Sequence, residues 1–215
     1  MRAPALIPFL AMVLLMVTGC GTLSGRGAPT RADRLITEGR ELARQGRLED
    51  AAQAFEDAVY ADPDNPDAHF YYARALLETG HTYRALDELE VADRLRPDHP
   101  RQRVLMGRIN LRLNRLEEAD AIITRAVETW PEEPQTHYAL GLLRLQQDRL
   151  EAAEVSLTRV VRAAPRTRGA QEMLGRVLLR LGRIDQAIGR FETAIEQRED
   201  DDLAHGGLAM ALVMS

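Results

Sequence analysis

Small residues recur along this chain at intervals of 34 residues. One series is alanine throughout: Ala51, Ala85, Ala119, Ala153 and Ala187. A second series keeps the same interval at Gly39, Ala73, Gly107, Gly141, Gly175 and Ala209, and a proline series keeps it at Pro63, Pro97, Pro131 and Pro165. A fixed period of this length, with proline where a helix must end, predicts a solenoid built from one repeated pair of helices. Such a chain presents an extended binding surface, and each repeat contacts mainly its neighbours.

Each repeat has the pattern of two helices with a short break between them. In the first repeat we expect helices over about residues 33–45 and 49–61, because Gly46 interrupts the pattern and Pro63 ends it. Apolar and small residues fall at helical spacing inside both segments. The sequence therefore predicts five full repeats and a terminal helix, with the bounds 32–65, 66–99, 100–133, 134–167, 168–201 and 202–215.

These residues at this period resemble the tetratricopeptide repeat (TPR) family over residues 32–215. The resemblance implies an all-α fold, a right-handed superhelix of helix-turn-helix repeats with a C-terminal half repeat, and a concave face lined by the first helix of each repeat. Four residues depart from the family pattern: Glu38, Asn110 and Arg144 replace an apolar residue, and Glu199 replaces the proline. We expect them to weaken single interfaces without changing the fold.

The first 20 residues have the features of a secretory signal. Arg2 precedes an apolar run of 15 residues, 3–17, and a membrane-spanning helix needs about 20. The run Val17-Thr18-Gly19-Cys20 resembles the lipobox of bacterial lipoproteins, and Cys20 is the only cysteine of the chain. The resemblance implies a signal peptide over residues 1–19 and a lipidated Cys20 that becomes the first residue after cleavage. An uncleaved anchor and a plain secreted protein are the alternatives.

Residues 20–31 then link the lipid to the folded part. They are small and polar, and Gly and Pro interrupt them, so we expect a flexible tether. The ten residues 21–30 reach at most about 35 Å when extended. In related lipoproteins an Asp after the cysteine favours the inner membrane, so Gly21 points to the periplasmic face of the outer membrane. This sorting rule varies between bacteria, and the inner membrane stays open.

The family register places a stripe of arginines on the predicted concave face, although the net charge of the chain is −5. The predicted partner-binding residues are Arg40, Arg44, Phe70, Arg74, Arg108, Arg112, Tyr138, Arg176 and Arg180. Such a stripe suits an acidic or C-terminal peptide segment, which the arginines would hold by charge-assisted hydrogen bonds and the aromatic rings by apolar contact. The other interpretation is a solvated face whose charges are paired along the helix, Arg74 with Glu78 and Arg176 with Glu172. The lysine–asparagine carboxylate clamp of chaperone-binding members is not predicted, because apolar residues and arginines stand in its place.

The last segment, Leu203–Met214, carries no charged residue after Asp202. Part of its apolar surface must cover the fifth repeat, and we expect the excess to serve self-association or a partner. A hydrophobic, frayed chain end is the other interpretation.

Several function classes find no support in the sequence. His69, His137 and His205 stand 68 residues apart, too far to share a metal whose ligands lie about 2 Å away. The chain has no lysine, and none of its three serines lies in a nucleophile elbow. No phosphate-binding glycine motif occurs, and the net negative charge does not favour nucleic acid. The sequence therefore predicts no enzyme, no cofactor, no metal and no nucleic acid.

These features favour a lipid-anchored scaffold that binds proteins on the periplasmic side of a bacterial outer membrane. It looks like the TPR lipoproteins that assist assembly of type IV or tight-adherence (Tad) pili and of secretion systems, which is the leading hypothesis. The alternative is an adaptor that regulates peptidoglycan hydrolases or serves polysaccharide export. No motif identifies the partner.

Overall fold

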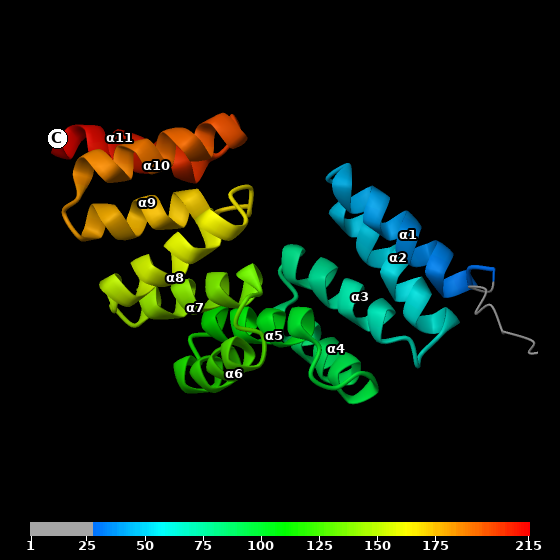
Figure 1. Cartoon of the computed structure of the whole chain (residues 1–215). Coiled ribbons are helices and arrows are strands. Elements are labelled where there is room, and N and C mark those ends of the chain that lie inside the picture. The colour runs from blue at the N-terminus through cyan, green and yellow to red at the C-terminus, as the bar shows by residue number, and fades with distance from the viewer. Residues whose placement is uncertain (1–27) are drawn as a thin grey trace, which may run out of the picture.

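The computed structural model describes residues 28–215. The predicted signal peptide, Cys20 and most of the tether therefore lie outside the described residues. The described part contains α-helices and no strand (Figure 1). The first helices of the five full repeats are α1 (Arg31–Arg44), α3 (Pro66–Glu78), α5 (Pro100–Arg112), α7 (Pro134–Gln146) and α9 (Ala170–Arg180). The second helices are α2 (Leu48–Ala61), α4 (Thr82–Leu95), α6 (Leu116–Thr129), α8 (Leu150–Ala163) and α10 (Ile184–Gln197).

The last helix of the described residues, α11 (Asp202–Met214), stands in the position of a first helix. The predicted all-α repeat solenoid is thereby confirmed. No helix of the described residues is long and apolar enough to span a bilayer. Residues 28–215 contain three clusters of buried apolar side chains.

Local sequence fixes where the helices begin and turn. Thr30 and Asp33 form a capping box at the start of α1, in which Thr30 Oγ1 accepts a hydrogen bond from the Asp33 amide at 3.1 Å. Proline opens α3, α5 and α7, where a missing N–H costs nothing. Between the two helices of each repeat the chain passes through a left-handed residue, in the order Gly46, Gly80, Asn114, Asp148 and Gly182. Gly, Asn and Asp tolerate this conformation best, and the series has the same 34-residue period.

The solenoid curves because its two kinds of helix stack differently. Each first helix contacts the next first helix along the chain, whereas no two second helices of the described residues contact one another. The first helices therefore lie on the inside of the curve. Figure 1 shows α3, α5 and α7 between two arms, α1–α2 and α9–α11, with α4 and α6 on the outer side. The face on which the arginines were predicted is thus the concave one.

Candidate partner-binding groove

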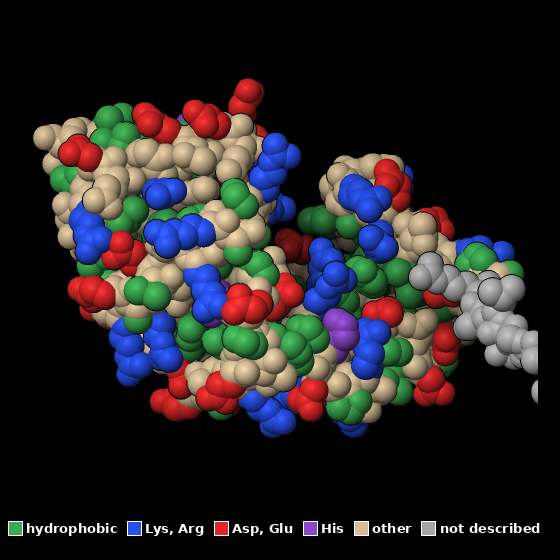
Figure 2. Space-filling model, viewed as in Figure 1, with side chains coloured by type: hydrophobic (Ala, Val, Ile, Leu, Met, Phe, Trp, Pro, Cys, Tyr) green, Lys and Arg blue, Asp and Glu red, His purple; other side chains and the backbone are tan. Residues whose placement is uncertain are grey.

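The seven predicted arginines all have exposed side chains on the first helices. Neighbouring cavities share them: Arg40 and Arg74 line one, Arg74 and Arg108 the next, and Arg108 with Arg112, Arg176 and Arg180 a third. The cavities therefore join into one surface, which we call the concave groove. Figure 2 shows arginine side chains on both sides of the space between the two arms.

Arg40, Arg74 and Arg108 carry free positive charge. No carboxylate of residues 28–215 lies within 4.0 Å of any of the three guanidinium groups. The pair that was predicted between Arg74 and Glu78 is therefore not formed, although both side chains are exposed on α3. The first three repeats thus offer a row of arginines available for an external anion.

The other four arginines are engaged within the chain. Arg44 lies 3.0 Å from the Glu41 carboxylate, and Arg180 is paired with Asp148 in the preceding repeat. Arg112 donates a hydrogen bond of 3.2 Å to the backbone carbonyl of Leu77. The predicted pair of Arg176 and Glu172 is loose, with 3.7 Å between Nη1 and Oε1. The paired interpretation of the stripe therefore applies to Arg44, Arg176 and Arg180. It does not apply to Arg112, which donates to a neutral carbonyl, nor to the first three arginines.

The two predicted aromatic residues differ in their place relative to the groove. Phe70 is 6 % exposed and lines none of the three cavities, which corrects the expectation for this ring. Tyr138 is 8 % exposed and lines the central cavity together with Arg74 and Arg108. Their row in the first helices is buried in every full repeat: Ile36, Phe70, Val104, Tyr138 and Glu172. Tyr138 reaches the next repeat, because a Cβ on Gly169 would lie 2.8 Å from its hydroxyl oxygen.

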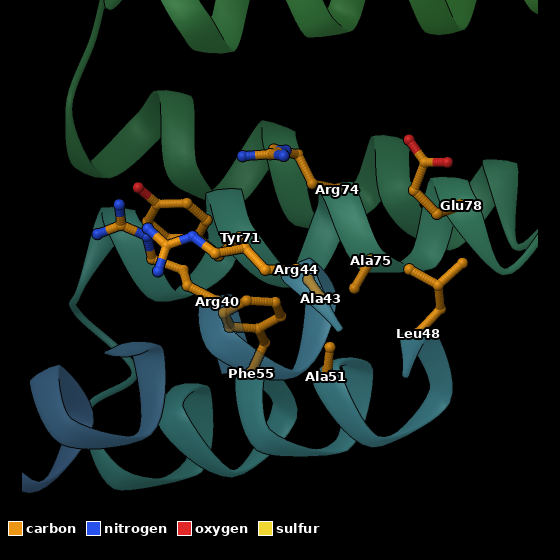
Figure 3. Close-up of a pocket in the computed structure, with 10 residues that line it drawn as sticks. All are labelled: Arg40, Ala43, Arg44, Leu48, Ala51, Phe55, Tyr71, Arg74, Ala75 and Glu78. Carbon is orange, nitrogen blue, oxygen red and sulfur yellow. The ribbon is translucent and has the colours of Figure 1, made fainter. Parts of the chain in front are cut away.

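The ring that lies between the arginines is Tyr71, the residue after Phe70. The guanidinium carbons of Arg40 and Arg74 lie 5.5 Å and 5.8 Å from its ring centroid (Figure 3). The Phe55 ring stacks on Tyr71 with 5.6 Å between centroids and 18° between planes. Tyr71 thus joins the first two repeats and holds two cations over an aromatic surface. Sequence reasoning missed it because the family register selected only its neighbour.

The lining of this first cavity is partly apolar. Leu48, Ala51 and Ala75 contribute to it, beside Phe55 and Tyr71. Further along, the groove is lined by Leu77, Leu142 and Met173 between its arginines. A segment with alternating acidic and apolar side chains would find complementary groups along the whole groove.

Glu172 places a buried carboxylate beside the groove. Its side chain is 2 % exposed on α9, and no donor of the described residues lies within hydrogen-bonding distance of Oε1. Burial raises the pKa of this carboxyl group, and the nearby Arg176 opposes the rise. The group lines the same central cavity as Arg74 and Arg108, so the groove combines an arginine row with one desolvated acid.

The periodic histidines have a structural role in the described part. Nε2 of His69 lies 2.8 Å from the carbonyl oxygen of Pro63, and the same contact recurs between His137 and Pro131 at 2.7 Å. His205 approaches the carbonyl of Glu199 at 2.8 Å. Residues 28–215 contain no group of three or more His, Cys, Asp or Glu side chains that could hold a metal. The arrangement of the groove suits binding by charge and apolar contact.

Two models of the tetratricopeptide repeat match the chain, one over residues 42–109 and 144–211 and the other over residues 104–167. The TPR protein TTC0263 of Thermus thermophilus has a similar structure, with a TM-score of 0.76, 24 % identity, and coverage of 85 % of this chain and 99 % of that one. PilW, described as a widely conserved type IV pilus biogenesis factor, has a TM-score of 0.69, 24 % identity, and coverage of 86 % and 87 %. YrrB, described as a TPR protein with an unusual peptide-binding site, has a TM-score of 0.52, 19 % identity, and coverage of 80 % and 89 %. At these identities the similarity establishes the fold alone. No curated protein sequence matches the chain significantly.

Proposed function

The chain belongs to the tetratricopeptide repeat family, and from that premise we propose that its concave groove binds an acidic segment of a partner protein. Members of this family are generally non-catalytic scaffolds for protein–protein interaction. The observation that carries the proposal is the row of Arg40, Arg74 and Arg108, which have no carboxylate partner within 4.0 Å among residues 28–215. An external carboxylate can bind such a group without displacing an internal one.

The Tyr71 cavity gives this row its anchor point. Two of the three arginines are held against the Tyr71 ring, so less side-chain freedom is lost when a partner binds. The apolar lining from Leu48 and Phe55 adds contact area for a side chain next to the acidic group. Peptide binding is also what the description of YrrB reports for that protein.

The proposal includes a lipid anchor at Cys20, which would hold the solenoid at the periplasmic face of the outer membrane. It is supported by the lipobox-like run that ends at the only cysteine. Replacing Cys20 with Ala in the full chain is expected to move the protein from the membrane fraction to the soluble fraction, since stable attachment needs the acyl chains. A Cys20→Ala protein that stays in the membrane fraction contradicts the lipid anchor.

The machine that the scaffold serves is proposed to be a type IV or Tad pilus or a secretion system. The similarity to the pilus biogenesis factor PilW over most of both chains supports this choice. The alternative is an adaptor of peptidoglycan hydrolases or of polysaccharide export. The identity of a partner bound at the groove decides between the two.

Affinity capture from the native envelope tests the proposal, with residues 28–215 as bait. The test variant reverses the groove charges through Arg40→Glu, Arg74→Glu and Arg108→Glu. The matched control reverses three exposed arginines of second helices, Arg94, Arg125 and Arg162, and so has the same net charge. We expect the wild type and the control to capture a partner that the groove variant loses. Equal capture by all three proteins contradicts the groove.

A further inference from the structure

Glu172 is the charged member of a row that is otherwise apolar or aromatic. Its equivalents in the four earlier repeats are Ile36, Phe70, Val104 and Tyr138, and all five side chains are buried. A buried carboxylate that lacks a hydrogen-bond donor destabilises the fold, and an apolar side chain at this position would not. A charged group that opposes folding and lines a cavity is a candidate for a binding function.

The carboxylate of Glu172 is short of hydrogen-bond donors where it meets the central cavity. Its Oε1 atom is buried and has no donor within hydrogen-bonding distance in the described part of the chain. Nη1 of Arg176 is 3.7 Å away, which is too far for a hydrogen bond. The residue lines the central cavity beside Tyr138 and also the two cavities on either side of it along α9. A bound segment that brings a donor into the central cavity would supply what this carboxylate lacks.

The same cavity carries a further arginine that the sequence analysis did not select. Arg168 precedes α9, its side chain is exposed and it lines the central cavity. No carboxylate of residues 28–215 lies within 4.0 Å of its guanidinium group. Arg198, on the same cavity, is paired with Asp201. The cavity therefore offers Arg74, Arg108 and Arg168 to external carboxylates, around one buried acid.

These charges restrict which group can bind to Glu172. An acidic side chain would be repelled by the ionised carboxylate, and a lysine or arginine would have to enter among three free arginines. A primary amide is neutral and has neither penalty. Its NH2 group donates to a carboxylate, and with a protonated carboxyl group it forms two parallel hydrogen bonds. Burial raises the pKa of Glu172, and an amide fits both forms of the group.

We propose that Glu172 is a specificity residue of the concave groove, which accepts a hydrogen bond from the side-chain amide of an Asn or Gln in the partner's segment. Acidic residues before and after that amide bind to Arg74, Arg108 and Arg168. The inference rests on the proposed function, because it requires an acidic segment in the groove. It adds one amide residue among the acids, which a row of arginines alone does not select.

Selection of short random peptides displayed on phage tests the inference, with residues 28–215 as the target. We expect the wild type to select peptides rich in Asp and Glu that have an Asn or Gln among the acids. Glu172→Leu makes the row apolar as in the earlier repeats, and should keep the selection of acids and lose that of the amide. The matched control is Glu128→Leu, which removes an exposed acid of α6 and gives the same net charge. It should select the same peptides as the wild type.

A double-mutant cycle with the strongest selected peptide measures the contact itself. Replacing the amide residue of the synthetic peptide with Ala should weaken its binding to the wild type at least about tenfold. The same replacement should change little for Glu172→Leu. The wild-type half of the cycle stands even if Glu172→Leu fails to fold, which circular dichroism shows.

The outcomes separate this inference from the function on which it rests. Acidic peptides without an amide preference overturn the inference and leave the groove in place. So does an amide preference that a folded Glu172→Leu protein retains, and so does selection of Lys or Arg in place of the amide. If the wild type selects no acidic peptides, the groove proposal is contradicted and the inference falls with it.

Discussion

A Cβ atom on Gly39 would lie 2.6 Å from Cε1 of Phe55. Gly39 belongs to the first helix of its repeat and Phe55 to the second, so the absent side chain is what lets the two helices touch. Phe55 cannot easily turn away, because its ring is also stacked on Tyr71 in the next repeat. The same relationship recurs between Gly175 and Phe191, where the distance is 2.8 Å.

Gly39→Ala is therefore expected to lower the free energy of unfolding by about 1–3 kcal/mol, which is the usual effect of overpacking a core. The matched control is Gly189→Ala, since Gly189 lies in α10 and a Cβ there would meet nothing within 4 Å. That change should raise stability by up to about 1 kcal/mol through helix propensity. Urea unfolding followed by circular dichroism measures both. Equal effects of the two substitutions would show that the Phe55 ring moves freely.

The repeat fold could be predicted from the sequence because each repeat follows the same packing rule. Gly39 and its equivalents mark where helices touch, and Pro63 and its equivalents mark where they end. A departure in one repeat does not obscure the pattern, since the other repeats keep it. The turn residues between the paired helices, such as Gly46 and Asn114, follow the same period and could have been predicted in the same way.

The groove could be predicted only in outline, because its details depend on side-chain contacts that do not repeat. The register placed the seven arginines on the exposed concave side, but it could not separate Phe70, which is buried, from Tyr71, which lies between arginines. Helical spacing suggested that Arg74 pairs with Glu78, and the structure keeps them apart. Gln102 is fully buried where other repeats have Ala68 or Ala170, and nothing in the sequence indicates how it is accommodated.

His69 gives stability a dependence on pH. Its Nδ1 lies 2.6 Å from Oε2 of Glu88, and this hydrogen bond is the main cause that raises the pKa of His69 above 6.5. Because the pKa of His69 is raised in the folded protein, the stabilisation from this group is full below about pH 6.5. It is lost as the pH rises through the pKa that His69 has in the folded protein. His69→Leu should cost about 2 kcal/mol under mildly acidic conditions and less under alkaline ones.

Urea unfolding at several pH values measures this difference. Glu88→Gln serves as the control, because it keeps a hydrogen-bonding side chain and removes the negative charge that favours protonated His69. The dependence on pH should be weaker in this variant than in the wild type. A cost of His69→Leu that is the same at every pH would show that the contact with the Pro63 carbonyl acts alone.

Glu172 is expected to oppose folding at neutral pH. Burial raises the pKa of its carboxyl group above 4.5, so the unfolded chain binds fewer protons there than the folded one. The stability that this carboxyl group contributes is therefore lost as the pH rises from about 4.5 through the pKa that Glu172 has in the folded protein. Glu172→Gln keeps the shape and removes the buried charge, and should raise the free energy of unfolding by about 1 kcal/mol at neutral pH. Chemical unfolding at about pH 4 should show little difference. A neutral-pH loss of stability would mean that the pair with Arg176 outweighs the desolvation.

Tyr71 should govern how tightly the groove binds its partner. Its ring holds the guanidinium groups of Arg40 and Arg74 at 5.5 Å and 5.8 Å, and each such contact is worth about 0.5–1 kcal/mol at an exposed site. Tyr71→Leu frees both arginines, so we expect the affinity for the captured partner to fall about tenfold. Tyr71→Phe keeps the ring and should bind like the wild type.

Titration calorimetry with the captured partner compares the three proteins, and thermal melting shows whether the loss of the Phe55 stack unfolds the first repeat. If Tyr71→Leu is folded and binds as tightly as the wild type, the arginines need no aromatic support, and their charge alone accounts for the binding.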